Sequence, residues 1–333
     1  MLADQTIVIT GVTGSLGSAL ARRLLAIQEG APRAIIGISR DEEKQQRLRQ
    51  EIATEVAAGT LAETPIDLRL GDVRDPATIA RALRGADVVL HAAALKQVPV
   101  CERSPEEAVR TNIGGPAHIV RAIVEHALPV AAVVGVSTDK ACEPASVLGM
   151  TKAVGERIFV AANLDAPDTR FVNVRPGNLL GSRGSVLPLW REQIARGGPV
   201  TITDPTMTRF LLTIDRAVDA MLFALEKGLR GETIVPRAPA VRLGDLAAVL
   251  IGDAAVELER IGARAGEKRH EMLVSAEEAP RTTVRGDHYV IAPDLPPLPR
   301  ENLRVDGLPL KGAVTSDRDL LTGAELEELL ARA

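Results

Sequence analysis

A strand-like apolar run followed by three spaced glycines constrains the fold of this chain more than any other feature. The run covers residues 6–10, and Gly11, Gly14 and Gly17 follow it as a helical pattern begins at Ser15. Glycines permit a tight turn and close approach of a ligand to the backbone, while a helix start offers free N–H groups to a phosphate. A glycine triplet also occurs in ordinary turns. Its position between a strand and a helix favours a dinucleotide-binding turn.

The first half of the chain alternates apolar runs with helical patterns. The runs are apolar on both faces, which is typical of a parallel sheet covered by helices on both sides. We expect strands at residues 6–10, 34–38, 67–70, 87–91 and 130–136. We expect helices at residues 15–27, 41–57, 76–83 and 105–126, the last with a capping box of Ser104, Pro105 and Glu107. The pattern predicts an α/β fold with a Rossmann-type doubly wound parallel sheet.

After about residue 171 turn signals and prolines become frequent, and regular patterns are sparser. Helical patterns return at residues 213–227, 243–250 and 322–332, and residues 293–299 form a proline-rich connector. We therefore expect a smaller C-terminal substrate domain that closes over the carboxyl ends of the strands. The dinucleotide-binding domain would comprise residues 1–178 and about 209–236, and the substrate domain about 179–208 and 237–333.

Composition excludes several classes of protein. A net charge of -4 over 333 residues offers no basic surface for nucleic acid, so we expect no nucleic-acid partner. No apolar stretch reaches the roughly 18 residues of a membrane span, so we expect a cytoplasmic protein without a membrane segment. Cys101 and Cys142 lack disulfide or metal spacing, and the five histidines form no ligand set. We expect no metal.

The end of the second strand indicates which dinucleotide binds. Enzymes that use NAD usually carry an acidic residue there, whereas this chain has Ser39 and Arg40, with Lys44 one helical turn later. Cationic side chains suit a 2'-phosphate, so NADP is the expected cofactor. A solvated arginine at a helix start is the alternative. The expected cofactor contacts are Gly11, Thr13, Gly14, Ser15, Leu16, Gly17, Ser39, Arg40, Lys44, Asp72, Val73, Ala92, Ala93, Ala94, Lys96, Asn112 and Lys152.

An acid and a base stand side by side where the fifth strand ends. Thr138, Asp139 and Lys140 follow that strand directly, and ligands bind at the carboxyl ends of such strands. Asp139 suits a general acid and Lys140 a general base. Burial would raise the pKa of Asp139 and lower the pKa of Lys140, as those roles require. A surface ion pair is the alternative interpretation.

Eight motifs along nearly the whole chain carry a family resemblance. They are SRDE (39–42), GDVRD (71–75), HAAALKQVP (91–99), TNI (111–113), STDKA (137–141), GSRGSV (181–186), MTRF (207–210) and GEKRHE (266–271). With them the chain resembles the extended short-chain dehydrogenase/reductases. More narrowly, it resembles the UDP-N-acetylglucosamine 4,6-dehydratases of bacterial surface-sugar and flagellin-glycan pathways.

The resemblance implies a reaction in which NADP+ takes a hydride from sugar C4 and later returns it to C6. In between, a base removes the C5 proton and an acid protonates the departing C6 hydroxyl. Asp139 and Lys140 match that acid and base, and Thr138 and Lys152 would help to deprotonate O4. Leu148 stands where soluble inverting members carry a tyrosine. Membrane-anchored relatives have methionine there and keep the C5 configuration, so we expect retention at C5. A decayed active site is the alternative.

The resemblance also implies a UDP-N-acetylhexosamine substrate and a homo-oligomer, dimer or larger, with self-association through helices at 105–126 and 148–163. The implied substrate contacts are Lys96, Asn178, Arg183, Val186, Arg209, Arg264 and Lys268. A nucleotide-sugar C4-epimerase or 5,6-dehydratase would share the first hydride step. The alternative outside the enzymes is a catalytically silent regulatory protein that binds NADP. The sequence leaves open the acyl group, the C4 configuration and the number of subunits.

Overall fold

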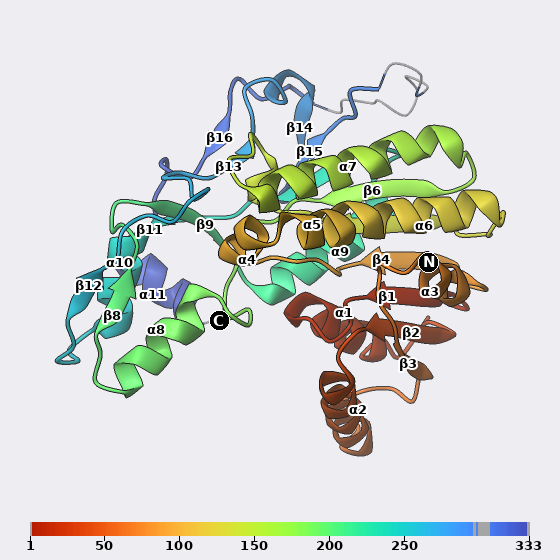
Figure 1. Ribbon diagram of the computed structural model, residues 1–333, viewed down its shortest axis with the longest axis horizontal. Helices are drawn as coiled ribbons and strands as arrows, with labels where there is room; N and C mark the ends of the chain where they lie inside the picture. The colour runs from red at the N-terminus through yellow and green to blue at the C-terminus, as the bar shows by residue number, and fades with distance from the viewer. Residues whose placement is uncertain (1, 296–297, 299–306, 332–333) are drawn as a thin grey trace.

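A nine-stranded sheet forms the centre of the protein (Figure 1). The computed structural model describes residues 2–295, 298 and 307–331. The strand order is β14-β15-β10-β6-β5-β4-β1-β2-β3, parallel from β3 through β10 and antiparallel at β15 and β14. These strands are β1 (Thr6–Thr10), β2 (Ala34–Ser39), β3 (Ile66–Leu70), β4 (Val88–His91), β5 (Ala132–Val136), β6 (Arg170–Val174), β10 (Thr233–Pro236), β14 (Thr282–Arg285) and β15 (His288–Ile291). The expected α/β class with a Rossmann-type parallel sheet is confirmed.

Helices cover both faces of this sheet. Successive strand residues point to opposite sides, and because the side chains on both sides are apolar, each face must be buried. In β1, Ile7 and Ile9 pack in one apolar core and Val8 packs in the other. The first core contains residues of α1 (Ser15–Leu25), α2 (Glu42–Ala57) and α9 (Ile214–Lys227). The second contains residues of α3 (Pro76–Leu83), α6 (Gly114–Glu125) and α7 (Val147–Asp165). Buried strands between two helical layers leave the carboxyl edge of the sheet as the place for a ligand.

The helix expected at 105–126 is interrupted. It consists of α5 (Pro105–Ala108), a π turn at Val109–Ile113 and α6, and a short α4 (Val98–Arg103) precedes it. The capping box is wrong, because Ser104 is the N-cap but makes no side-chain cap bond and Glu107 binds Arg74 and Arg110 instead. The π turn has a local purpose. It places Asn112 so that its amide donates to the Leu95 carbonyl and accepts from the Leu95 N–H.

A smaller lobe forms from the later part of the chain, around the buried side chains of Trp190, Leu246 and Leu326. It contains the sheets β11-β9-β7, β12-β8 and β13-β16. Its elements are β7 (Asn178–Leu179), α8 (Val186–Ala195), β8 (Val200–Ile202), β9 (Thr208–Leu212), β11 (Ala240–Arg242), α10 (Leu243–Ile251), β12 (Leu258–Arg260), β13 (Met272–Val274), β16 (Val314–Thr315) and α11 (Gly323–Ala331).

Strand pairing does not follow the domain boundaries that the sequence predicts. β9, expected in the dinucleotide-binding part, pairs with β7 and β11 of the small lobe. The hairpin β14–β15, expected in the substrate part, extends the main sheet because β15 pairs with β10. Pro296, Pro297 and Pro299 of the expected connector and Arg332 of the expected last helix lie outside the described residues.

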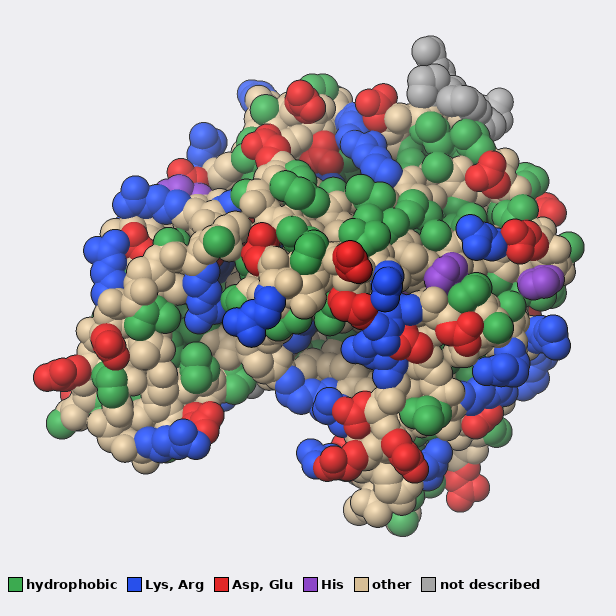
Figure 2. All heavy atoms as spheres, viewed as in Figure 1, with side chains coloured by type: hydrophobic (Ala, Val, Ile, Leu, Met, Phe, Trp, Pro, Cys, Tyr) green, Lys and Arg blue, Asp and Glu red, His purple; other side chains and the backbone are tan. Residues whose placement is uncertain are grey.

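Apolar side chains gather on the face that carries α6 and α7 (Figure 2). Val109, Val124, Met150 and Val154 are exposed there. In the part of the chain that the structure describes, no helix is long and apolar enough to span a membrane. The same residues contain no group of three or more His, Cys, Asp or Glu side chains that could hold a metal ion.

Candidate active site

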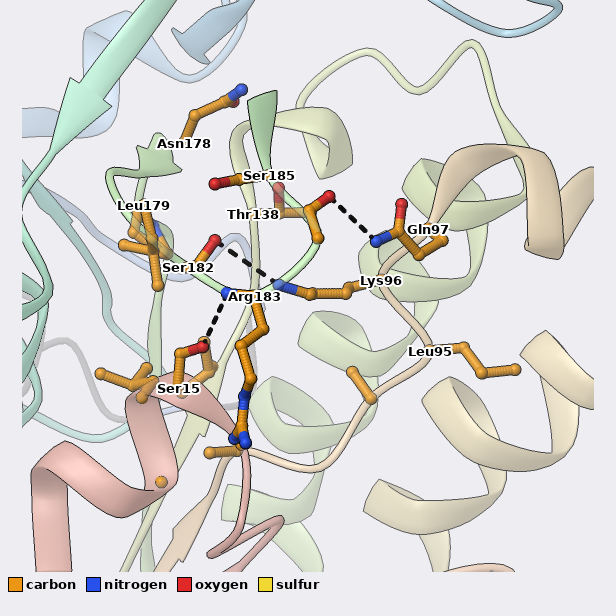
Figure 3. A pocket seen from close by; sticks show the side chains of 18 of the residues that line it. Ser15, Leu95, Lys96, Gln97, Thr138, Asn178, Leu179, Ser182, Arg183 and Ser185 are labelled. Atoms are coloured by element: carbon orange, nitrogen blue, oxygen red, sulfur yellow. Dashed lines mark hydrogen bonds between the residues drawn. The ribbon is translucent and has the colours of Figure 1, made fainter. Parts of the chain in front are cut away.

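A cavity of about 620 Å³ opens at the carboxyl edge of the main sheet. Its walls come from the segments after β1, β4, β5 and β6, from α7, and from the loop at residues 182–185. Figure 3 shows side chains from these segments converging on one space. The predicted site residues that line the cavity are Thr13, Gly14, Ser15, Leu16, Gly17, Lys44, Ala92, Ala94, Lys96, Thr138, Lys140, Lys152, Asn178 and Arg183.

The glycine-rich loop has the geometry of a dinucleotide cradle. Gly11 has φ +72°, and a Cβ on it would lie 2.7 Å from the Ala93 backbone nitrogen. A Cβ on Gly17 would collide with the Gly11 carbonyl. α1 starts at Ser15 without a side-chain cap and without an acidic residue in its first turn. The free N–H groups and the positive end of the helix dipole therefore suit a pyrophosphate.

Arg183 reaches this cradle from the opposite wall. Its backbone N–H donates to Ser15 Oγ at 3.0 Å (Figure 3). Its guanidinium donates to the Thr13 carbonyl. The family resemblance implies that Arg183 contacts the nucleotide sugar. In the structure its side chain instead lies against the glycine-rich loop.

The residues at the end of β2 already have partners. Arg40 Nη1 lies 3.8 Å from Asp72 Oδ2, and Lys44 Nζ donates to Asp41 Oδ2 at 2.6 Å. Ser39 Oγ accepts from Gln45 Nε2 at 3.0 Å. The cations are partly exposed, so their ion pairs are weak and a competing phosphate can displace the carboxylates.

Three other expected cofactor contacts, Val73, Ala93 and Asn112, are not among the residues that line the cavity. Val73 is buried, and its carbonyl contacts His118 Nδ1 at 2.9 Å. Ala93 packs against the second core beside the cradle. Asn112 is buried and holds the Leu95 backbone. Asn112 therefore positions the loop that carries Lys96, and its amide is occupied by the protein.

The acid and the base meet at the wall of the cavity. Lys140 Nζ lies 3.0 Å from Asp139 Oδ1 and 3.1 Å from Asn178 Oδ1. The Asp139 side chain is 0% exposed, and its Oδ1 also accepts from the Thr138 hydroxyl at 3.0 Å. Thr138 and Lys140 line the cavity and Asp139 lies behind them. A surface ion pair is excluded by this burial.

Glu271 is a site residue that the sequence reasoning missed. Its Oε1 lies 3.2 Å from Lys140 Nζ, and its side chain is 1% exposed. Burial of the amine would lower the pKa of Lys140, but the charges of Asp139 and Glu271 outweigh burial and raise it. The expected lowering of the Lys140 pKa is therefore wrong for this arrangement. The signal was present, since Glu271 ends the GEKRHE motif, but spacing along the chain gave it no role.

Lys152 lies one turn after Leu148 on α7, and both line the cavity. Lys152 Nζ donates to the Val136 carbonyl. Burial lowers the pKa of Lys152 to about 8, against a smaller opposing effect of Glu156. A lysine with this pKa is neutral in a useful fraction of molecules near pH 7 to 8, so it can accept a proton.

The residues expected to hold UDP are divided between two places. Lys96 and Asn178 line the cavity, and Lys96 Nζ lies 3.5 Å from Ser182 Oγ (Figure 3). Arg209 is buried and pairs with Glu267 at 3.2 Å. Lys268 Nζ donates to the Cys142 carbonyl at 2.5 Å. Arg264, which is exposed, and Val186, at the start of α8, do not line the cavity.

Comparisons with known proteins agree with this fold and show the family of the chain. The family model described as "Polysaccharide biosynthesis protein" matches residues 7–293. A UDP-glucose 4-epimerase of Rickettsia conorii is 41% identical over 301 residues, which are 88% of this chain and 84% of that protein. A Methanocaldococcus jannaschii protein, described as an uncharacterized membrane protein, is 39% identical over 87% of this chain and 86% of its own length.

Solved structures share the architecture. The X-ray structure of Pen from Bacillus thuringiensis has a TM-score of 0.90 and 30% identity, and covers 100% of this chain and 99% of its own. DesIV, a dTDP-glucose 4,6-dehydratase from Streptomyces venezuelae solved with NAD and TYD bound, has a TM-score of 0.69 over 79% of this chain and 86% of its own. At 21% identity the second likeness shows the fold alone.

Proposed function

This chain belongs to the polysaccharide biosynthesis protein family, within the extended short-chain dehydrogenase/reductases, and we propose that it dehydrates a UDP-N-acetylhexosamine across C5 and C6 with NADP as cofactor. UDP-N-acetylglucosamine is the substrate we expect, and the product is a 4-keto-6-deoxy sugar nucleotide with the C5 configuration retained. The observation that carries the proposal is the contact of 3.0 Å between Lys140 and Asp139 at the wall of the cavity. It brings an amine and a carboxyl to the same edge as the dinucleotide cradle.

A nicotinamide dinucleotide, when bound, supplies the hydride acceptor for oxidation at C4 and the hydride donor for reduction at C6. The side chains of this chain move the protons. Thr138 and Lys152 line the cavity and help to remove the O4 proton. The lowered pKa of Lys152 supports this role, and Leu148 supplies no titratable group.

The elimination needs a neutral amine and a protonated carboxyl. Moving one proton from Lys140 to Asp139 converts their ion pair into that pair, because the two groups are already hydrogen bonded. Lys140 then removes the C5 proton and Asp139 protonates the C6 oxygen, which leaves as water. Asp139 is fully buried, so its proton reaches the cavity through the Thr138 hydroxyl at 3.0 Å.

The preference for NADP is supported by Arg40 and Lys44 at the end of β2, where a 2'-phosphate would meet two cations. Both side chains are half exposed despite their ion pairs, so they remain accessible to a phosphate. The residues that would hold the pyrophosphate are the N–H groups at the start of α1, with Arg183 opposite them. For the nucleotide sugar, Lys96 and Asn178 remain the best-placed candidates.

A homo-oligomer is supported by the exposed apolar side chains on the face of α6 and α7, including Val124, Met150 and Val154. We propose that this face joins copies of the chain. Light scattering on the purified protein measures its molar mass in solution, which should be a multiple of the chain mass. Replacement of Met150 and Val154 by lysine should lower this molar mass. A monomer in the unaltered protein would contradict this part.

A nucleotide-sugar C4-epimerase is the second candidate, because relatives about two-fifths identical to this chain carry the name UDP-glucose 4-epimerase. An epimerase oxidises C4 and returns the hydride to C4, so it needs no acid for C6. A 5,6-dehydratase would eliminate the same water but return the hydride to C4, so its product would keep the C4 hydroxyl, carry a C5–C6 double bond and fail to react as a ketone. A regulatory protein would bind the cofactor and release no altered sugar.

Mass spectrometry of the sugar nucleotide separates these reactions. Purified protein incubated with UDP-N-acetylglucosamine should yield a product lighter by one water that reacts as a ketone. An isobaric product would favour the epimerase. An unchanged substrate, with UDP-glucose also unchanged, would favour the regulatory reading. Lys140→Met serves as the inactive control and Lys227→Met, at an exposed lysine, as the active one.

A further inference from the structure

Glu271 belongs to the small lobe yet ends at the reactive amine. The segment before β13 carries it, and its backbone N–H donates to Ser316 Oγ at 2.8 Å while its carbonyl accepts from the Ser316 N–H at 2.9 Å. Ser316 is itself buried. These bonds fix the backbone of Glu271, so its carboxylate is held at 3.2 Å from Lys140 Nζ.

Lys140 therefore lies between two buried carboxylates. Asp139 Oδ1 is 3.0 Å away and Glu271 Oε1 is 3.2 Å away. The second oxygen of each carboxylate, Asp139 Oδ2 and Glu271 Oε2, is buried and has no hydrogen-bond partner among the described residues. Each of these oxygens can accept a proton, and the charged forms of both acids depend on nearby cations for stability.

The other charged groups around Lys140 do not replace Glu271. Arg209, from β9, lies 3.9 Å from Glu271 Oε1 and offsets part of its charge. Lys152 from α7 and Lys96 from the loop after β4 line the same cavity, and neither carries a negative charge. Lys268 donates to the Cys142 carbonyl beside the turn that carries Lys140. Among the residues that the structure describes, Asp139 and Glu271 are thus the acidic groups in direct contact with this amine.

We propose that Glu271 is a positioning residue of the proton-transfer site, which holds the Lys140 amine in place and favours the proton on Lys140 over Asp139. Through this contact the small lobe acts on the protonation of the reactive pair. The inference deepens the proposed function and rests on it for the role of Lys140 as base. The direction of the Lys140 pKa agrees with the geometry.

The direct test is a titration of the lysine amines by NMR with 13C at Cε, in a chain that has seven lysines. Lys140→Met removes one resonance and so assigns it. In Glu271→Gln the Lys140 resonance should titrate at lower pH than in the unaltered protein, and Glu271→Asp should restore most of the difference. Glu267→Gln, which loses a contact with Arg209 but none with Lys140, is the matched control. An unchanged Lys140 titration in Glu271→Gln would overturn the proposal.

The unaltered protein covers the case in which Glu271→Gln fails to fold. There the charges of Asp139 and Glu271 outweigh burial and raise the pKa of Lys140, so its amine should titrate at higher pH than an ordinary lysine. A Lys140 amine that titrates at or below the pH of an ordinary lysine would equally overturn the proposal. Neither titration needs turnover, so absence of a dehydrated product would count against the proposed function alone.

Turnover gives a third readout that a merely structural role would not move. If Lys140 must be neutral to act, the acid limb of the kcat profile should move to lower pH in Glu271→Gln. The ratio of kcat at pH 6 to kcat at pH 8 should rise several-fold and return in Glu271→Asp. A uniform loss of kcat at every pH would show a structural role and contradict the proposal.

Discussion

Replacement of Lys152 by methionine tests whether the site retains a buried amine at a cost to folding. Burial takes the pKa of Lys152 from 10.5 to about 8, a change of about 2.5 units. At 1.36 kcal/mol per unit, the protonated lysine destabilises the folded state by about 3 kcal/mol below pH 8. The cost falls as pH rises above 8 and vanishes above the unfolded pKa, because both states are then neutral.

The difference in stability between the two proteins should therefore depend on pH. From pH 7 to pH 9.5 the unaltered protein should gain about 2 kcal/mol relative to Lys152→Met. The hydrogen bond from Lys152 to the Val136 carbonyl is lost at both pH values, so it cancels. Urea unfolding at the two pH values measures the change. Lys227→Met is the control, since that side chain is 58% exposed.

A constant difference between the unaltered protein and Lys152→Met across this pH range would refute the reasoning. It would mean that the amine titrates in the folded protein as it does in the unfolded chain. A loss of stability by the unaltered protein relative to Lys152→Met as pH rises would have the wrong sign and would point to an amine stabilised by charge.

Three further changes test other parts of the account. Asp139→Asn should lower kcat by roughly 10²-fold or more, since general acid catalysis contributes about 10² to 10⁴, and coupled product assays measure it. Arg40→Ala should weaken NADP binding by about 10-fold or more and leave NAD nearly unchanged, as fluorescence titration of both dinucleotides would show. Arg175→Met should destabilise the protein by about 3 to 5 kcal/mol in urea, because it leaves the buried Glu156 carboxylate without its cation and Glu278 with only the more distant Arg281, at 3.9 Å.

The parallel sheet could be predicted because its sequence signal is local. The run at 6–10 and the helix at 76–83 match β1 and α3 to the residue, since apolar patterning and an Asp-Pro start mark them. The π turn in the expected helix 105–126 could not be predicted, because it accompanies a tertiary contact of Asn112 with Leu95 that local patterning does not reveal. The pairing of β15 with β10 is equally non-local.

In the candidate site, too, residues with a local sequence signal could be predicted and a residue brought in by tertiary structure could not. Position after a strand predicts Thr138, Asp139 and Lys140, and position on the next helix predicts Lys152. The structure brings Lys140 and Lys152 to one cavity. Glu271 was missed because it is far from Lys140 in sequence and approaches it in space through the small lobe. The expected lowering of the Lys140 pKa is wrong for the same reason, since burial lowers this pKa but the charges of Asp139 and Glu271 raise it further.

Proton NMR of the product formed from UDP-N-acetylglucosamine in deuterated water tests the central claim most directly. If Lys140 removes the C5 proton and solvent later replaces it from the same side, the product is a 4-keto-6-deoxy sugar with one deuterium at C5 and the D configuration. A C4 epimer without deuterium at C5 would contradict the elimination, and an L-configured ketone would contradict retention.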